Sequence, residues 1–287
     1  MKQASKKIFI TGATGNVGSV LTKNLSDIEN VNVFLGTRDQ DKVNQDNKNS
    51  LHTFLYFDFE TKIYPDQSFD AIFLVRPPHI ADPNIFENYL STLQKSTKIV
   101  FLSVKGAEHK SYLPHAKIEK LIQNMGFKHV FIRPSYFMEN LLTTLWGELR
   151  NNYRIFLPSG NLAFNWVSVQ DIAIAAKQAL LHDLSENHLE VCNFQNHNFY
   201  EVVDIINKVC NTKIRFESPN LIKYVLYNLK KGEKISYLLI MLLLHYLPKF
   251  QKSEVYSSRQ FEAILNKRPT SLESFVKQNK SHFQALR

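Results

Sequence analysis

Residues Thr11 to Gly18 read TGATGNVG, and they follow the apolar run KKIFI and precede the helical spacing of VGSVLTKNL. The glycines Gly12, Gly15 and Gly18 stand three residues apart, between a predicted strand and a predicted helix. In a dinucleotide-binding loop such glycines permit a tight turn, a close approach of the backbone to a pyrophosphate, and close packing of helix on strand. The N-terminus of the helix would then offer free N–H groups and a partial positive charge to the anion.

Further apolar runs extend this pattern along the chain. They lie at residues 31–36, 53–59, 70–75, 98–104 and 128–134, separated by segments with helical spacing. Continuous apolar runs are typical of parallel strands that are buried on both faces. We predict an α/β fold with a doubly wound parallel sheet of the NAD(P)-binding Rossmann type. Residues 1–150 would form the nucleotide-binding domain, its sheet completed by later residues, and residues 151–287 a smaller, mostly helical lobe on the substrate side.

The end of the second predicted strand indicates which dinucleotide is bound. It reads FLGTRD, so that Gly36, Thr37 and Arg38 occupy the place where a carboxylate would bind the ribose of NAD. An arginine there suits a 2′-phosphate, which favours NADPH over NADH. The alternative is an ordinary solvated arginine, and Asp39 beside it weakens the argument.

Composition restricts the other classes of partner. The net charge is +9, yet no run of five like charges occurs, so nucleic-acid binding ranks last. Cys192 and Cys210 show no metal-binding spacing, which predicts free thiols, no metal site and a cytoplasmic protein. The N-terminal MKQASKK has no apolar signal core. The apolar run at residues 235–247 is too short to span a bilayer, so we expect a helix buried against the nucleotide-binding domain or a partner subunit, and no membrane partner.

The chain resembles the atypical short-chain dehydrogenases/reductases, in particular their NmrA-like members, which include NAD(P)H-dependent quinone and azo-dye reductases and redox-sensing NADP-binding proteins. The resemblance rests on TGATGNVG, on Arg38, and on the segments HAKIEKLIQNMGF, FIRPSYFMENLL and VSVQDIAIAAKQAL. The closing NKRPTSLESFVKQNKSHF is also similar to the end of that family. Asp171 in the third segment is predicted to cap a helix and to take no part in chemistry.

The resemblance implies a set of site residues. Segments after the third and fourth strands would line the cofactor, a strand-five hydroxyl would lie near the nicotinamide, and the FIRPSYFMEN segment would border the acceptor. The cofactor-binding candidates are Thr11, Gly12, Thr14, Gly15, Asn16, Val17, Gly18, Thr37, Arg38, Asp58, Phe59, Val75, Arg76, Ser103 and Lys117. The acceptor-binding candidates are Tyr136, Phe137 and Asn140.

One motif departs from the family. Its dehydrogenases typically carry Tyr-x-x-x-Lys, whereas this chain reads YLPHAK, with Leu113 four residues before Lys117 and Tyr112 one place too early. A slip of one residue turns a helical side chain by about 100°. Lys117 remains the one catalytic candidate, against the alternative of a solvated charge. His115 could supply a proton near neutral pH or be a polar surface group.

Two functions from different classes follow. The first is an NADPH-dependent reductase that passes hydride to a quinone, an azo compound or another electron-poor conjugated small molecule, which needs no positioned acid. The second is a catalytically weak sensor of NADP redox state that binds a protein partner. A homodimer is compatible with both.

Overall fold

The computed structural model describes residues 5–45, 52–250, 261–263 and 266–286. The N-terminal stretch for which no signal core is expected lies mostly outside this range. Contacts group the chain into two units: a sheet unit of residues 1–135, 169–191 and 259–268, and a helical unit of residues 136–168, 192–258 and 269–287. The sequence interpretation placed one boundary near residue 150, whereas the chain passes between the units five times.

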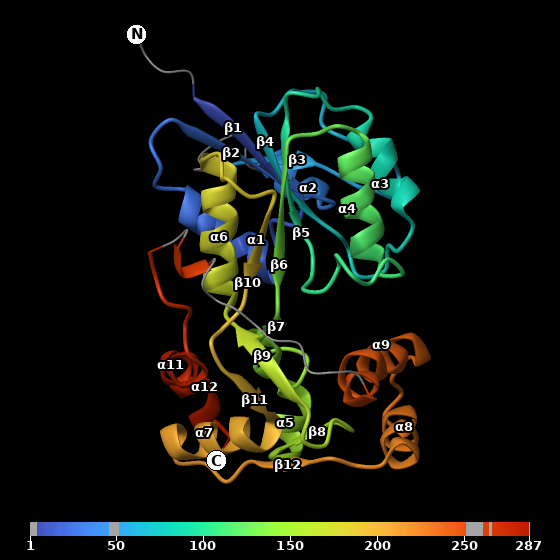
Figure 1. Cartoon of the computed structure of the whole chain (residues 1–287), viewed down its shortest axis with the longest axis vertical. Helices are drawn as coiled ribbons and strands as arrows, with labels where there is room; N and C mark the ends of the chain where they lie inside the picture. The colour runs from blue at the N-terminus through green and yellow to red at the C-terminus, as the bar shows by residue number, and fades with distance from the viewer. Residues whose placement is uncertain (1–4, 46–51, 251–260, 264–265, 287) are drawn as a thin grey trace. The chain divides into compact units, whose positions relative to one another are not determined.

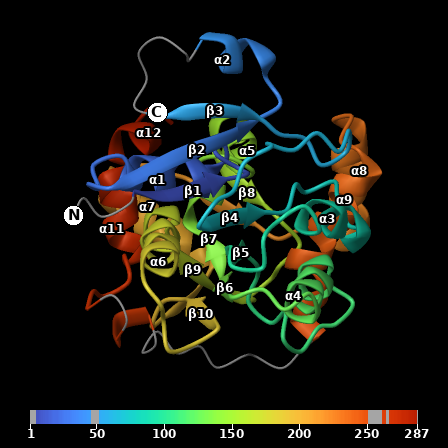
Figure 2. The ribbon, with the colours of Figure 1, turned by 90° about the horizontal axis from the view of Figure 1, so that it is seen from above.

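The sheet unit is built on seven parallel strands in the order β10-β6-β5-β4-β1-β2-β3. Their bounds are β1 Lys6–Ile10, β2 Val31–Thr37, β3 Thr53–Tyr56, β4 Ala71–Val75, β5 Lys98–Leu102, β6 His129–Pro134 and β10 His188–Val191. Helices α1 (Asn16–Leu25) and α6 (Val169–Leu181) pack together on one face. Helices α3 (Pro83–Leu90) and α4 (Pro114–Asn124) pack on the other, as Figure 2 shows. Helix α2 (Gln40–Gln45) lies between β2 and β3 in the chain.

The apolar runs account for this arrangement. Ala71, Ile72, Phe73 and Leu74 of β4 are all fully buried, as expected of a central parallel strand covered on both faces. The core on the side of α3 and α4 is strongly aromatic, and includes Phe9, Phe57, Phe59, Phe69, Phe86, Tyr89, Phe101 and Phe131. The predicted doubly wound parallel sheet is confirmed.

Helix ends in the sheet unit follow local signals. Helix α4 begins with Pro114 at its first turn and is followed by Gly126 at φ +75°, as the sequence predicts. Helix α6 begins at Val169, so Asp171 lies within its first turn and not at the N-cap position itself. Asp171 is buried there, with Oδ1 3.2 Å from Nζ of Lys267.

The helical unit holds two small sheets, one of β11 (Asn196–Asn198), β9 (Ala163–Val167) and β7 (Tyr136–Phe137), the other of β12 (Arg215–Glu217) and β8 (Arg154–Phe156). Around them lie η1 (Met138–Leu141), α5 (Trp146–Asn152), α7 (Phe199–Cys210), α8 (Leu221–Lys230), α9 (Ile235–His245), η2 (Leu247–Phe250), α11 (Leu272–Gln278) and α12 (Lys280–Gln284), all labelled or coloured by position in Figure 1. Its core is centred on Trp166, Phe199, Ile206, Phe275 and Phe283.

The apolar segment at residues 235–247 forms the expected helix over Ile235–His245. Only Leu238, Met241 and His245 of this helix are buried, and the first two belong to the core of the helical unit. Leu239 and Ile240 are 62% and 48% exposed. Within the described chain the segment is therefore only partly buried, and its burial against a partner subunit stays a prediction. None of the helices described is both long and apolar enough to cross a bilayer.

Candidate functional site

The glycine loop joins β1 to α1 and holds its shape through backbone contacts. The amide of Gly15 donates to the carbonyl of Gly12 at 3.0 Å. A Cβ on Gly18 would lie 2.0 Å from that carbonyl oxygen, so the third glycine is needed for the helix to pack against the loop. A Cβ on Gly15 would meet only the same oxygen, at 3.3 Å. Packing within the chain thus explains Gly18 but not Gly15.

Helix α1 presents its N-terminus beside this loop. Gly15 is the N-cap residue with extended backbone angles, and no side chain caps the helix. The first turn, which starts with Asn16, Val17 and Gly18, contains no acidic residue. Amide N–H groups at such a terminus, together with the helix dipole, favour an anion.

A pocket of about 270 Å³ opens at the carboxyl ends of β1, β2, β3 and β4, within the sheet unit. This is the edge where doubly wound folds bind their ligands. Ten of the predicted cofactor residues line it: Thr11, Gly12, Thr14, Gly15, Thr37, Arg38, Asp58, Phe59, Val75 and Arg76. The lining also contains Gly36 and Pro77, which flank predicted residues, and residues that the sequence reasoning missed: Phe57, Glu60, Pro78, His79 and Ile80.

Thr11 ties the two central strands together at the pocket. Its Oγ1 accepts from the amide of Val75 at 2.9 Å and donates to the carbonyl of Phe73 at 3.3 Å. A Cβ on Gly12 would lie 2.9 Å from Cβ of Val75, so this glycine lets β1 end close against β4. The floor of the pocket is therefore fixed by the chain itself.

The mouth of the pocket at β2 carries both signs of charge. Nη1 of Arg38 lies 3.9 Å from Oε2 of Glu60, and Nε2 of His79 lies 3.3 Å from the same oxygen. The Arg38 side chain is 64% exposed, so its pairing with Glu60 is weak and can be exchanged for a ligand. Glu60, two residues beyond Asp58, was a signal in the sequence that the prediction did not use.

Arg76 braces the loop that covers the other side of the pocket. Its Nη1 donates to the carbonyls of Pro77, Pro78 and Ile80 at 2.7–3.0 Å, and its Nε donates to Nε2 of His115 at 3.3 Å. Burial lowers the pKa of Arg76. The guanidinium thus holds residues 76–80 in one conformation.

His115 is not suited to give a proton near neutral pH. Burial, with the charge of Arg76 beside it, lowers the pKa of His115 to about 3. The neutral ring also accepts the Arg76 hydrogen bond at Nε2, so that nitrogen carries no proton to give. The expectation that His115 could act as a proton donor is therefore wrong.

Ser103 lies at the end of β5, buried, and its hydroxyl donates to Oε1 of Glu119. Glu119 in turn accepts two hydrogen bonds from Arg133, at 3.0 and 2.6 Å, and both charged side chains are buried. The Ser103 hydroxyl is thus engaged in a buried ion pair between α4 and β6. Its contact with a nicotinamide stays a prediction.

Lys117 is exposed on the first turns of α4, and the lining of the pocket does not extend to it. Tyr112 lies before the helix and is 60% exposed. Pro114 separates the two as the sequence indicates. A role for Lys117 in binding the ribose stays a prediction.

The three acceptor candidates lie in the helical unit. Tyr136 and Phe137 form β7, and Asn140 lies in η1. The Tyr136 ring packs against Phe164 and Trp166, and burial raises its pKa. No group of three or more metal-ligating side chains was found in the described part of the chain.

No family model matches this chain. It is 33% identical over 220 residues, 73% of this chain and 71% of the relative, to prestalk A differentiation protein A of Dictyostelium discoideum. It is 26% identical over 189 residues, 63% of this chain and 65% of the relative, to an NAD(P)H azoreductase of Xenophilus azovorans. The fold is similar to that of an NADPH-dependent quinone oxidoreductase of Escherichia coli crystallised with NADPH, with a TM-score of 0.76, 15% identity, and coverage of 95% of this chain and 99% of the other.

Sequence and fold agree on one family. The glycine loop, the parallel sheet and the pocket at its carboxyl edge have the arrangement expected from the sequence motifs, and the identity to the Dictyostelium protein extends over most of both chains. The chain therefore belongs to the NmrA-like group of the atypical short-chain dehydrogenase/reductase family.

Proposed function

We propose that this protein is an NADPH-dependent oxidoreductase that transfers hydride to a quinone, an azo compound or another electron-poor conjugated small molecule. The observation that carries the proposal is Gly15. It lines the pocket, and its own chain leaves a Cβ there almost unopposed. A glycine at this point is explained by a ligand group, such as a pyrophosphate, that must come close to the protein backbone.

The chain's own groups fit the parts of a dinucleotide. The uncapped N-terminus of α1 would receive the pyrophosphate. Arg38, at the end of β2, would bind a 2′-phosphate in exchange for its exposed pairing with Glu60. The brace formed by Arg76 would keep the loop of residues 76–80 against the ligand.

The reaction class follows from the state of two candidate proton donors, Tyr112 and His115. Bound NADPH would supply the hydride. Tyr112 lies outside α4 and His115 is neutral, so neither offers a placed acid. Quinones and azo compounds can accept hydride directly and take their proton from water, whereas simple ketones need an acid. The names of the azoreductase and the quinone oxidoreductase to which the chain is similar agree with this class.

A second function is favoured by the same lack of an acid. A protein that binds NADPH without turnover would act as a redox sensor for a protein partner. The pocket supports both functions equally, because binding requires only the loop, the helix terminus and Arg38.

One experiment separates the two. NADPH is titrated by its fluorescence, and its oxidation is then followed by absorbance with a panel of quinones, azo dyes and simple ketones. We expect binding, and turnover with quinones or azo dyes but not with ketones. Binding without oxidation by any acceptor would support the sensor, and absence of NADPH binding would overturn both functions.

A further inference from the structure

Helices α8 and α9 expose a run of large apolar side chains that the proposed function does not use. We define the hairpin surface as the exposed apolar residues between positions 222 and 250 on these helices and on η2. The two helices contact each other, and both lie within the helical unit (Figure 1). The residues are Ile222, Leu226, Leu229, Ile235, Leu239, Ile240, Leu243, Leu244, Leu247 and Phe250, each between 43% and 74% exposed.

Helix α9 is apolar on all sides. Its sequence, ISYLLIMLLLH, contains no Asp, Glu, Lys or Arg, and its one histidine, His245, is buried at its end. A helix that is apolar all round is normally surrounded by an apolar medium. Here the protein covers only the side with Leu238 and Met241, and the opposite side is open. The exposed side of α9 is therefore apolar but has no apolar surroundings within the described chain.

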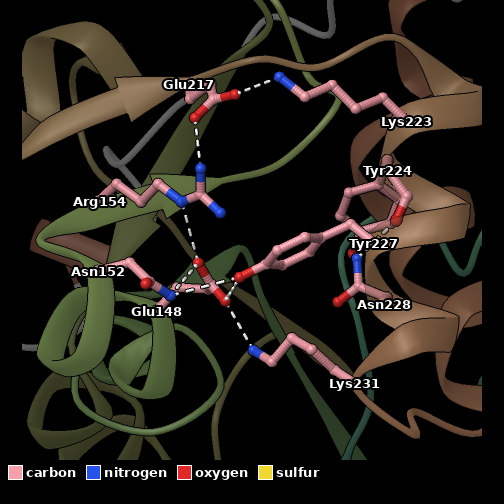
Figure 3. A network of polar contacts seen from close by, with 9 residues as sticks. All are labelled: Glu148, Asn152, Arg154, Glu217, Lys223, Tyr224, Tyr227, Asn228 and Lys231. Carbon is pink, nitrogen blue, oxygen red and sulfur yellow. Dashed lines mark hydrogen bonds and ion pairs between the residues drawn. The ribbon is translucent and has the colours of Figure 1, made fainter.

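Helix α8 is firmly held, so its exposed side chains are presented in a fixed position. Figure 3 shows Glu148 of α5 at the centre of a polar network. Glu148 accepts from the Tyr227 hydroxyl at 2.8 Å and from Lys231 at 2.6 Å. Arg154 donates to Glu148 at 3.1 Å and to Glu217 at 2.6 Å. Although burial alone would raise it, hydrogen bonds from these donors lower the pKa of Glu148, which stays charged.

The hairpin surface is bordered by positive charge. Between residues 220 and 250 the chain has five lysines and one glutamate, Glu233. Two of these lysines are paired with acids of neighbouring elements, Lys223 with Glu217 and Lys231 with Glu148, so the border carries less positive charge than this count. All five lysines are exposed: Lys223, Lys230, Lys231, Lys234 and Lys249. An open groove of about 470 Å³ on α8 combines both features, since Ile222, Leu226, Lys223 and Lys230 line it together with Asn220 and Tyr227.

We propose that the hairpin surface binds an anionic membrane surface, with its apolar side chains at the acyl boundary and its lysines among the headgroups. A helix with apolar contacts on one side and lysines at its border binds in this way. The 11 residues of α9 extend only about 16 Å, against about 30 Å for the hydrocarbon core, so it would lie in the interface rather than span it. The sequence alone predicts burial of this segment and no membrane partner, and the proposal departs from both.

A second copy of the chain fits this surface less well. A two-fold dimer brings the same patch of both subunits together, which would place the exposed lysines of one copy, such as Lys230 and Lys234, near those of the other. Like charges that face each other across an interface are unfavourable. An anionic surface neutralises these charges instead, and it can cover the apolar residues at the same time.

Vesicle sedimentation with the full-length protein tests the proposal. Vesicles of phosphatidylcholine alone are compared with vesicles of equal parts phosphatidylcholine and phosphatidylglycerol. We expect sedimentation with the anionic vesicles and at least about tenfold weaker partition with the neutral ones, and we expect added salt to weaken the anionic binding.

Two variants and two controls locate the surface. The double variant Leu239→Glu/Leu243→Glu should lose binding to anionic vesicles, while Ile63→Glu, at a 48% exposed isoleucine of the sheet unit, should keep it. Lys230→Glu/Lys234→Glu should weaken binding by at least about tenfold, while the same reversal at the exposed Lys23 and Lys120 should weaken it less. Unchanged circular dichroism and NADPH binding would show that the variants fold.

A fluorescence measurement supplies an independent readout. Phe250 is 74% exposed, so Phe250→Trp should gain emission that lipids with brominated acyl chains quench, beyond the quenching seen with the unaltered chain. Equal binding to neutral and anionic vesicles would overturn the proposal, as would binding that the Leu239→Glu/Leu243→Glu change leaves intact. A dimer that this change dissociates, with no vesicle binding at all, would assign the surface to a second copy instead.

Discussion

The phenol of Tyr136 and the imidazole of His245 form a hydrogen bond of 2.9 Å inside the helical unit. Nδ1 of the same ring lies 2.9 Å from the carbonyl of Met241, which can only accept, so Nδ1 carries the proton. Nε2 of the neutral ring then accepts the hydroxyl proton of Tyr136. Burial lowers the pKa of His245 to about 4.

This pair makes stability depend on pH. An unfolded histidine has a pKa near 6.5, so between about pH 4 and 6.5 the unfolded state binds a proton that the native state does not. The contribution of the neutral ring to stability is complete above about pH 6.5 and is lost as the pH falls towards 4, by about 3 kcal/mol at most.

Urea unfolding at pH 7 and pH 5 should show lower stability at pH 5, and His245→Gln should show a smaller difference between the two pH values. His115 contributes in the same direction, so a residual slope is expected in the variant. Equal slopes in both proteins would contradict the assignment.

Removing one member of the buried pair of Glu119 and Arg133 should lower the free energy of unfolding more than replacing both members with apolar side chains. Removing Glu119 alone, as in Glu119→Leu, leaves a buried guanidinium with Glu108, 3.2 Å from its Nη1, as remaining acidic partner, and should destabilise the protein by at most about 3–5 kcal/mol. The double change Glu119→Leu/Arg133→Met should recover most of this loss. Thermal unfolding of the two variants measures both effects. Additive losses in the double variant would mean that the two side chains act independently.

Two glycines of the loop should respond differently to substitution. Gly15→Val should fold, because its Cβ meets only one oxygen at 3.3 Å, yet it should weaken NADPH binding by at least about tenfold. Gly18→Ala should destabilise the fold itself, because its Cβ would lie 2.0 Å from the Gly12 oxygen. Fluorescence titration and thermal unfolding check the two effects. Normal NADPH binding by a folded Gly15→Val protein would exclude the loop as the phosphate site.

Arg38 and Glu60 should change the choice of dinucleotide in opposite directions. Arg38→Ala should lower the ratio of NADPH to NADH affinity by about tenfold, through loss of one charge-assisted contact. Glu60→Gln should raise that ratio, because Arg38 and His79 are then released from the carboxylate. Arg268→Ala, at an arginine whose side chain is 85% exposed, serves as the control. A ratio near one in the unaltered protein would contradict the expected preference.

Substitutions at Lys117 and Tyr112 should have different effects, because we expect Lys117 to contact the cofactor and Tyr112 to have no part in proton transfer. Lys117→Ala is expected to weaken cofactor binding or slow turnover by about tenfold or more, and Tyr112→Phe to change little. Lys120→Ala, on the same helix, is the matched control. Steady-state rates with a quinone provide the measurement. If the protein reduces ketones and Tyr112→Phe abolishes this activity, Tyr112 acts as the proton donor and the prediction is wrong.

The fold and the pocket floor were accessible from sequence because each depends on short-range patterns. Apolar runs predict buried strands, and the glycine spacing predicts the turn, so Thr11, Gly15 and Arg38 were all placed at the pocket. Glu60 and His79 were missed because they meet only when two loops, 19 residues apart, fold over the same edge. The partner of His115 was missed for a similar reason, since Arg76, which donates to its ring, lies 39 residues earlier in the chain.

The open side of α9 was missed for a different physical reason. Hydropathy reports that a segment avoids water, but it does not say what covers the segment. The run at residues 235–247 therefore predicted burial, and the structure buries only three positions of the helix.

The last strand of the sheet, β10, is synthesised only after the chain has passed through a segment of the helical unit. Strand β10 pairs with β6 at the sheet's edge, yet it follows β6 by more than fifty residues, all of the first helical-unit segment lying between them. While the ribosome is still adding that segment, β6 has its partner β5 on one side and an unpaired, largely buried apolar edge on the other. Such an edge is a site for mispairing with another nascent chain. The sheet is therefore complete only once residues 169–191 have been made. A chain that is released before residue 191 would leave the ribosome without β10, and the edge of β6 would stay unpaired.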